Sequence, residues 1–445
     1  MIEILRYPSF RSLFLAQVIA LVGTGLATVA LALLAYDLAG DQAGAVLGTA
    51  LAIKMTVYVL LSPVAAALIP RTRRKVVLIA LDLVRAGVAL CLPFVTEIWQ
   101  VYLLIALLQS ASACFTPLFQ SLIPEILPEE RDYTRALSLS RLAYDLESLL
   151  SPLLAAALLT VINFHGLFAG TSLGFVLSAL LVLGTRFPAV VDARTGGSPY
   201  ARAIRGMRIY LQTPRLRGLL ALNLVAAAGG AMVFVNTVVI VRTVLGGGDR
   251  EVAWALAAFG GGSMFVALLL PKLLDRVPDR RVMLTAAIAM VISLSATAVL
   301  WLGSGDRIGW PVLIPAWLLL GMAYAGLVTP GGRLLRRSAV SDDLPFLFAA
   351  QFSLSHVCWL LAYPLAGWVG ATMGLGTALV ALALLSMLGC ATAVLTWPKQ
   401  DPSSVPHRHE DLPPDHPHLA EHAKADNGEH EHPYMIDELH ERWPR

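Results

Sequence analysis

The histidines of this chain gather near its C-terminus, and their spacing suits the binding of a metal ion. Eight of the ten histidines follow Lys399, in a segment rich in Pro, Asp and Glu, and six of them form three His-x-His pairs. Neutral imidazole is a favoured ligand for nickel, copper, zinc and cobalt, and flexible pairs can close around one ion. We therefore expect this segment to bind Ni²⁺, Co²⁺ or Zn²⁺; the alternative is a solvated polar tail. The candidate ligands are His407, His409, His416, His418, His422, His430, His432 and His440.

A second set of chemically capable residues lies inside long apolar stretches. Ionisable side chains are costly within a membrane and usually mark transport pathways or proton relays. Arg141 and Asp145 are four residues apart, on one helical face, and can pair with each other. Glu147 and Lys54 then need other partners. The candidate residues for transport and proton coupling are Glu147, Asp145, Lys54, Arg141 and His356.

Within this set we expect Glu147 to exchange protons, because Arg141 can hold Asp145 ionised. Lys54 would compete with a cationic substrate for the carboxylates. A permanent buried cluster of Lys54, Asp145 and Glu147 that fixes two helices is the structural alternative. His356 fits a packing role as well as a ligand role.

Other polar residues in the apolar stretches have weaker signals. Asp82 and Arg85, near one end of a stretch, are expected to form a structural brace. Uncharged polar residues can line a cavity or form hydrogen bonds between helices. They are Gln17, Gln109, Asn223, Asn236 and Gln351.

The elements that must position these residues are membrane-spanning helices. The chain has 445 residues, of which 57% are hydrophobic and 14% charged, against about 25% charged in soluble domains. A span needs about 20 apolar residues, and its backbone must form its own hydrogen bonds. The sequence predicts an all-α protein with twelve spans, near residues 12–36, 43–69, 76–96, 98–122, 135–162, 166–187, 217–241, 252–272, 282–303, 309–332, 345–369 and 373–397.

Basic residues indicate how these helices are oriented. With the N-terminus in the cytoplasm, 22 Lys and Arg residues fall in or beside the inner loops and three in the outer loops. Loops rich in Lys and Arg stay inside. We therefore expect both termini in the cytoplasm of a bacterium, with the chain crossing the inner membrane. Because the arginines serve topology, the net charge of +3 does not indicate a nucleic-acid partner.

The chain also divides into two similar halves. Short basic loops follow the second span, at Pro70 to Lys75, and the eighth, at Asp275 to Arg281. The expected organisation is a first six-helix half (1–187), a cytoplasmic linker (188–214), a second six-helix half (215–398) and a disordered His-rich cytoplasmic tail (399–445). Paired halves of this kind place a substrate site between them.

These two loops resemble the Gly-x-x-x-Asp-Arg-x-x-Arg-Arg loop of the major facilitator superfamily. The first copy has Pro70 in place of the Asp, whereas the second keeps Asp275 and has Pro271 in place of the Gly. The resemblance implies that the loops latch one conformation. The implied latch residues are Arg71, Arg74, Lys75, Asp275, Arg276, Arg280 and Arg281.

Two further segments are similar to the exporter branch of that superfamily: Phe115 to Glu125, and Ala136 to Pro152. Together with the His-rich tail, they resemble the NreB-type nickel-resistance permeases. Ile436, Leu439 and Trp443 would share one face of a short docking helix, although a disordered end is an equal alternative.

The leading functional hypothesis is proton-coupled export of divalent metal cations, chiefly nickel and secondarily cobalt, by a monomer that needs no cofactor. The chain has no Gly-x-x-x-x-Gly-Lys-Ser/Thr loop for ATP and no His-Glu-x-x-His zinc-protease motif. We expect a transporter and not an enzyme. The alternatives are an exporter of an organic compound, such as a drug or siderophore, with a regulatory or incidental tail, and a metal-sensing receptor. Acidic groups at the site would favour a cation, and aromatic and apolar ones an organic substrate.

Overall fold

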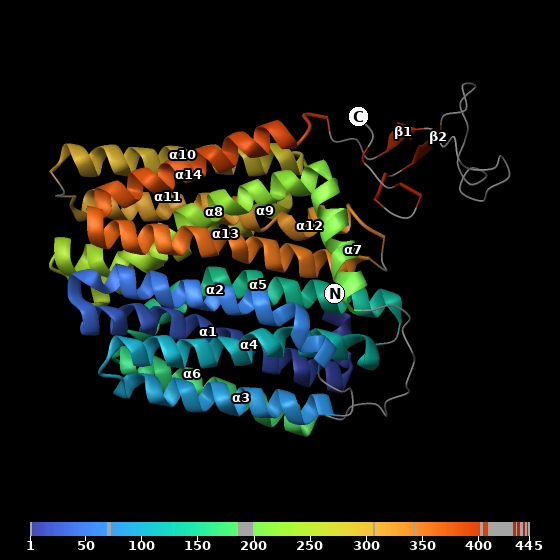
Figure 1. Ribbon diagram of the computed structural model, residues 1–445, viewed down its shortest axis with the longest axis horizontal. Coiled ribbons are helices and arrows are strands. Elements are labelled where there is room, and N and C mark those ends of the chain that lie inside the picture. The colour runs from blue at the N-terminus through green and yellow to red at the C-terminus, as the bar shows by residue number, and fades with distance from the viewer. Residues whose placement is uncertain are drawn as a thin grey trace.

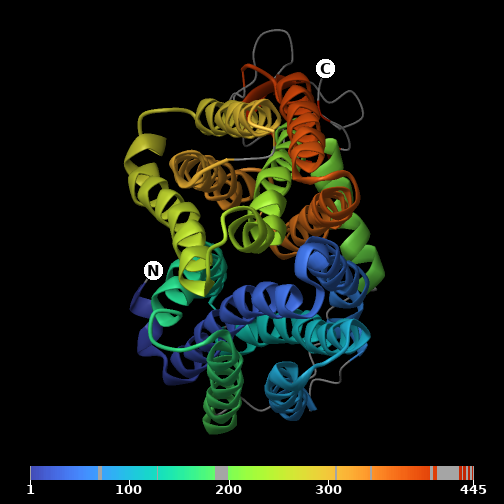
Figure 2. The ribbon, with the colours of Figure 1, turned by 90° about the vertical axis from the view of Figure 1, so that its left-hand side faces the viewer.

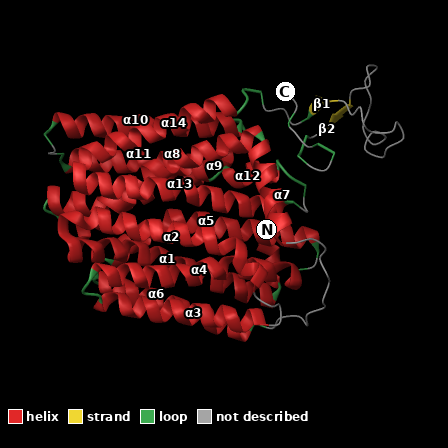
Figure 3. Cartoon of the chain, in the orientation of Figure 1, coloured by secondary structure: helices red, strands yellow, loops and turns green. Residues whose placement is uncertain are grey.

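The computed structural model describes residues 2–68, 73–127, 129–185, 199–305, 308–340, 343–400, 404–407, 430–432, 434–436, 439–440 and 443. Almost all of these residues are helical, and the long helices run roughly parallel to one another (Figure 1, Figure 3). Ten stretches of the described chain are long and apolar enough to cross a membrane, and the first, Pro8–Leu61, contains two helices. The predicted all-α membrane fold is confirmed.

Six long helices form the first half. After a short 3-10 helix, η1 (Ile2–Arg6), come α1 (Pro8–Ala39), α2 (Ala43–Leu68), α3 (Arg74–Cys91), α4 (Ile98–Ile126), α5 (Glu130–Leu158) and α6 (Phe164–Gly184), with 3-10 turns η2 (Gly40–Gln42) and η4 (Leu92–Phe94) between helices. Helix α5 is not among the ten apolar stretches found in the described residues, and its first half carries several charged residues.

Six more long helices form the second half. They are α8 (Pro214–Val239), which continues into a π-helical turn η5 (Ile240–Val244), then α9 (Asp249–Leu274), α10 (Asp279–Gly303), α11 (Trp310–Val328), α13 (Leu344–Met373) and α14 (Leu375–Thr396). A short helix, α12 (Gly331–Arg336), follows α11. These bounds agree with the twelve predicted spans to within a few residues.

The two halves lie side by side, and two pairs of helices make most of the contact between them. Helices α1–α6 form one bundle and α8–α14 the other (Figure 1, Figure 2). Across the boundary, α2 packs along α13 and α5 packs along α9. Both chain ends lie at the same end of the molecule (Figure 1), as an even number of spans requires. The basic loops assign this end to the cytoplasm.

Local sequence fixes where several helices begin and end. Helix α1 ends at Gly40 and α13 ends at Gly374, whose φ angles of 53° and 91° are in the left-handed region that glycine adopts without strain. Helix α6 begins after Asn163, whose side chain accepts a 3.0 Å hydrogen bond from Gly166 N. Large apolar side chains are exposed along α6, α10 and α14, which places them against lipid.

The predicted linker contains a helix that the sequence argument did not identify. Helix α7 (Pro199–Gln212) packs against α13. Arg205 forms an ion pair of 2.7 Å with Asp343, and the Tyr210 hydroxyl donates to Gln351 Oε1. Burial raises the pKa of Tyr210 well above its usual value, so the phenol keeps its proton and remains the donor. The linker is therefore attached to the second half.

Candidate functional site

Glu147 lies where α5 meets α1. Ser151, one turn further along α5, donates a 3.3 Å hydrogen bond to Glu147 Oε1. A Cβ atom added to Gly25 of α1 would stand 1.8 Å from Ser151 Oγ and 2.8 Å from Glu147 Oε1. Only glycine therefore lets α1 approach this carboxylate so closely. The sequence argument selected Glu147 but not Gly25.

Lys54 of α2 lies close enough to Glu147 for their opposite charges to interact. Both side chains are half-buried. In the described structure no ion pair at contact distance joins them, so the two charges are neighbours without being locked together. The sequence argument also placed Asp145 and Arg141 here, and their side chains lie outside the described residues.

Aromatic side chains of the second half adjoin this pair through Tyr363. Tyr363 of α13 lies close enough to Glu147 to interact with it electrostatically. The Trp359 ring centroid is 4.9 Å from that of Tyr363, 6.1 Å from that of Phe234 on α8 and 6.3 Å from that of Tyr324 on α11. We call Phe234, Tyr324, Trp359 and Tyr363 the aromatic wall. Carboxylate and ring faces together form a surface suited to an organic cation.

A glycine also shapes the aromatic wall. A Cβ atom added to Gly230 of α8 would stand 2.4 Å from the outermost ring carbon of Trp359. The close approach of the α8 backbone at Gly230 is thus made to an aromatic ring. The sequence argument missed Trp359, although Phe352, His356, Trp359 and Tyr363 recur at helical spacing and could have indicated a common face.

His356 lies at the boundary between the halves, one turn from Phe352 on α13. Its Nδ1 is 2.6 Å from the Phe352 carbonyl oxygen, which can only accept, so Nδ1 carries the hydrogen. Its ring stacks on Tyr58 of α2, with centroids 5.2 Å apart and an interplanar angle of 5°. His356 therefore joins the two halves through a ring stack beside the aromatic wall.

Hydrogen bonds and close backbone contacts join the halves at the outer end. The hydroxyls of Tyr36 and Thr243 are 3.1 Å apart, and Thr243 donates a 2.8 Å hydrogen bond to Asp41. A Cβ atom on Gly367 of α13 would stand 2.3 Å from the Gly44 carbonyl oxygen of α2. The halves therefore meet tightly at the end away from the cytoplasm.

Comparison with known proteins identifies the family of this chain. The family model described as Major Facilitator Superfamily matches residues 13–248 and 219–426. The chain belongs to the major facilitator superfamily. It is a transporter of the bacterial inner membrane, with several spans.

Curated relatives in this superfamily include efflux proteins. The chain is 22% identical over 346 residues to the uncharacterized MFS-type transporter YfiS of Bacillus subtilis, covering 76% of this chain and 81% of the relative. It is 25% identical over 305 residues to macrolide efflux protein A of Enterococcus faecalis, covering 64% and 90%. The same-named protein of Streptococcus pyogenes is 24% identical over 337 residues, covering 72% and 80%. The closer resemblance to nickel-resistance permeases stays a prediction.

Solved structures of the superfamily share the fold. A bacterial homolog of the human lysosomal transporter Spinster, in an inward-facing and unoccupied conformation, has a TM-score of 0.64 at 13% identity, covering 88% of this chain and 97% of that one. The nucleoside transporter NupG, as its D323A mutant, has a TM-score of 0.63 at 12% identity, covering 87% and 100%.

The two basic loops that resemble the superfamily motif contact the ends of neighbouring helices. Lys75 Nζ donates a 2.8 Å hydrogen bond to the Thr185 carbonyl at the end of α6. Arg280 Nε donates a 3.1 Å hydrogen bond to the Trp397 carbonyl after α14. Arg74 is buried, and Arg71 lies outside the described residues. Within each half, a basic loop residue is therefore tied to the cytoplasmic end of another helix.

In the second loop the ion pairs converge on an acid that the sequence argument did not select. Asp279, buried at the start of α10, lies 3.0 Å from Arg337 and 3.4 Å from Arg333. Asp275 and its neighbour Arg276 are exposed, and so is Arg281. Burial makes the charge of Asp279 costly unless it is paired, so Asp279 is the structural centre of this loop.

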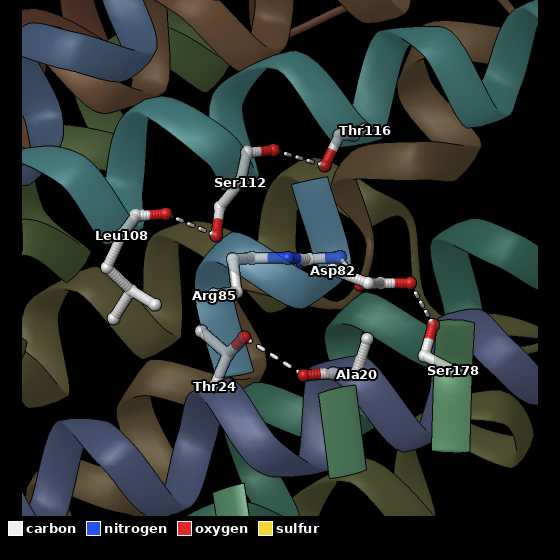
Figure 4. Close-up of polar contacts among 8 residues, drawn as sticks. All are labelled: Ala20, Thr24, Asp82, Arg85, Leu108, Ser112, Thr116 and Ser178. Carbon is white, nitrogen blue, oxygen red and sulfur yellow. Dashed lines mark hydrogen bonds and ion pairs between the residues drawn. The ribbon is translucent and has the colours of Figure 1, made fainter. Parts of the chain in front are cut away.

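Asp82 and Arg85 form the predicted brace inside the first half (Figure 4). They pair with each other, and Ser178 of α6 donates a 2.8 Å hydrogen bond to Asp82. The Arg85 guanidinium carbon lies 4.1 Å from the ring centroid of Phe115 and 4.5 Å from that of Phe175. This buried pair ties α3 to α4 and α6.

Two short strands pair within the described part of the C-terminal tail. Strand β1 (Val405–His407) pairs antiparallel with β2 (His430–His432), and His407 lies opposite His430. The other described residues are not helical, so the docking helix considered above does not form there.

The end of the tail nevertheless packs on the protein. Tyr434 and Ile436 belong to the buried core, and His440 is 2% exposed. The Trp443 ring lies over the guanidinium of Arg215 on α8, with 5.1 Å between the guanidinium carbon and the ring centroid. Ile436 and Trp443 of the expected face therefore pack on the protein, together with Tyr434 and His440, whereas Leu439 is exposed.

The predicted metal ligands can be placed only in part. The described residues contain no group of three or more His, Cys, Asp or Glu side chains that could hold a metal ion. Of the eight tail histidines, the structure describes the side chain of His440 alone. His409, His416, His418 and His422 lie outside the described residues, as do the side chains of His407, His430 and His432.

Proposed function

We propose that this transporter exports an amphiphilic organic cation from the cytoplasm in exchange for protons. The observation that carries the proposal is the position of Glu147, whose carboxylate lies on the first half, near Tyr363 at the edge of the aromatic wall of the second. A carboxylate attracts a cationic group, and ring faces attract both that charge and the apolar body attached to it.

The exchange follows from competition for one carboxylate. With the outer end closed by the contacts of Tyr36, Thr243 and Gly367, substrate reaches Glu147 from the cytoplasm and displaces its proton. After the halves rock to open the outer side, a periplasmic proton displaces the cation. Lys54 beside Glu147 lowers the affinity of the site for either cation, so each can leave.

Two further observations support this proposal. Two relatives, which align with this chain over most of their own length, are named macrolide efflux proteins. Macrolides are organic compounds. The aromatic rings of the wall are also not among the ligand types that nickel prefers. The expectation that a wall of aromatic side chains indicates an organic substrate therefore favours what was the alternative hypothesis over the leading one.

The test uses purified full-length protein in proteoliposomes that contain a pH-sensitive dye and carry an inward-acid pH gradient. Ethidium is the organic cation, a macrolide is a second candidate, and an uncharged aromatic compound of similar size is the control. We expect ethidium or the macrolide to be transported and to dissipate the gradient, whereas the uncharged compound does neither. If only Ni²⁺ dissipates the gradient, the organic-cation proposal is wrong.

A second candidate function is the proton-coupled export of nickel or cobalt. The observation that favours it is the concentration of eight histidines, in three His-x-His pairs, after Lys399. Imidazole must be unprotonated to bind metal, so binding should weaken as pH falls through about 6.5. Titration calorimetry of the full-length protein, with a variant that ends at Lys399 as control, measures this binding. Ni²⁺ uptake into the same proteoliposomes then decides whether the metal is cargo or only a ligand of the tail.

A further inference from the structure

A small cavity lies beside Lys54 inside the first half. It opens between α1, α2 and α4, and its free volume is about 10 Å³, enough for one water-sized group. Its polar lining consists of Thr24, Thr28, Lys54 and Gln109, and the remaining lining residues are apolar. Because Lys54 also interacts with Glu147, this side chain has two polar neighbourhoods.

The cavity offers hydrogen-bond acceptors. The Thr24 hydroxyl donates to the Ala20 carbonyl at 3.0 Å (Figure 4), and the Thr28 hydroxyl donates to the Thr24 carbonyl at 3.0 Å. Their hydrogens are thus used, and their oxygen lone pairs remain available. Gln109 is only 5% exposed, and its Oε1 has no hydrogen-bond partner in the described chain. Buried polar atoms without partners are uncommon in folded proteins.

Three oxygen acceptors match an ammonium group, which has three donors and no acceptor. Lys54 is the cation already tethered at this cavity. We propose that the cavity is a second binding station for the Lys54 ammonium, which moves there when a proton or an organic cation occupies Glu147. This inference rests on the proposed function, and it assigns Thr24, Thr28 and Gln109 as positioning residues that act through Lys54.

The second station explains how a cation can enter a site that already holds one. A displaced ammonium inside the membrane is costly if it finds no acceptor. With oxygens of Thr24, Thr28 and Gln109 at hand, Lys54 keeps its charge and leaves Glu147 to the incoming cation. The other titratable groups facing Glu147 in the described structure are Tyr363, on the second half, and Lys54 itself.

A double-mutant cycle tests the proposal. Gln109→Leu removes the unpartnered oxygen at similar volume, and Lys54→Met removes the ammonium at similar length. We expect Gln109→Leu to weaken ethidium binding by about tenfold in the wild-type background, because Lys54 then stays on Glu147. In the Lys54→Met background, Gln109→Leu should change the ethidium Kd by less than about twofold.

Thr28→Val removes a second acceptor from a different helix and should act in the same direction, by about threefold, whereas Thr28→Ser keeps the oxygen and should match the wild type. Binding is measured with purified full-length protein in nanodiscs, after thermal unfolding shows that each variant is folded. Equal effects of Gln109→Leu in both backgrounds, or no effect in either, overturn the second station while leaving the proposed function intact. Absence of ethidium and macrolide binding by the wild type overturns the proposed function, and the inference with it.

Discussion

The two halves of this transporter contribute different chemistry to the proposed site. On the first half, Lys54 and Glu147 supply a loose pair of opposite charges. On the second half, Trp359 and its aromatic neighbours supply ring faces and no charged group. Neither set alone would hold an amphiphilic cation well, and the site exists because α13 lies against α2.

With this arrangement, a membrane protein can separate proton coupling from substrate recognition. A charge inside the bilayer needs partners and therefore needs a dedicated polar environment, here within α1, α2, α4 and α5. Ring faces have no such requirement and can be rearranged at small energetic cost. We expect proton exchange to depend on the first half and substrate choice to depend on the second.

We expect the largest effect on transport when the titrating group of the first half is removed. Glu147→Gln keeps the shape and the hydrogen bond from Ser151, but it cannot exchange a proton. We expect proton-coupled export to stop, and the affinity for ethidium to fall by about 10- to 100-fold because a charge-assisted contact is lost. The measurement is ethidium transport with the pH-sensitive dye in proteoliposomes.

Ser151→Ala is the matched control, because it removes the hydroxyl partner of Glu147 and leaves the carboxylate. It should retain exchange. Normal export by Glu147→Gln protein would show that Glu147 is not the coupling residue, and loss of that protein from the membrane would show that it is structural.

Asp82 and Arg85 are also charged residues of the first half, but their role is structural. Asp82→Asn leaves Arg85 buried between two phenylalanine rings without its counter-charge. Breaking a buried pair in this way costs about 3 to 5 kcal/mol of folding free energy. We expect a lower thermal unfolding temperature in detergent, with a normal transport rate for the protein that remains folded. A variant that is stable but fails to couple protons would place this pair in the transport mechanism.

The second half should respond in substrate affinity. Trp359→Leu removes the ring face at moderate volume, and we expect a loss of about 3- to 30-fold in affinity for ethidium, as the loss of a cation–π contact predicts. Trp359→Phe keeps a ring face and should retain most of the affinity. Proton transport by each variant at saturating ethidium should stay near normal. If Leu and Phe behave alike, the ring face does not recognise the charge.

The sequence predicted the twelve membrane helices and singled out Lys54 and Glu147 as candidates, because charges within apolar runs are conspicuous. It did not predict the aromatic wall. Aromatic side chains are as stable facing lipid as facing a site, so the spacing of Trp359 and Tyr363 alone does not show which face is turned inward. Asp279 was missed for a related reason: its partners, Arg333 and Arg337, belong to α12 and its end, far along the chain from Asp279.

The tail belongs to neither half, and we expect its variants to have the smallest effect on export. Its end is held by Trp443 over Arg215 and by the rings of Tyr434 and His440, whose centroids are 4.6 Å apart. Because Trp443 is only partly buried, we expect this contact to contribute about 0.5 to 1 kcal/mol. Trp443→Ala should therefore free the end of the tail a few-fold more often, which limited proteolysis with trypsin measures as faster cleavage after Lys399. Ethidium export should stay within about twofold of wild type, because both halves of the site are unchanged. Trp443→Phe keeps a ring over Arg215 and should resist trypsin as the wild type does. A large change in export by Trp443→Ala alone would mean that the tail, and not only the two halves, controls the site.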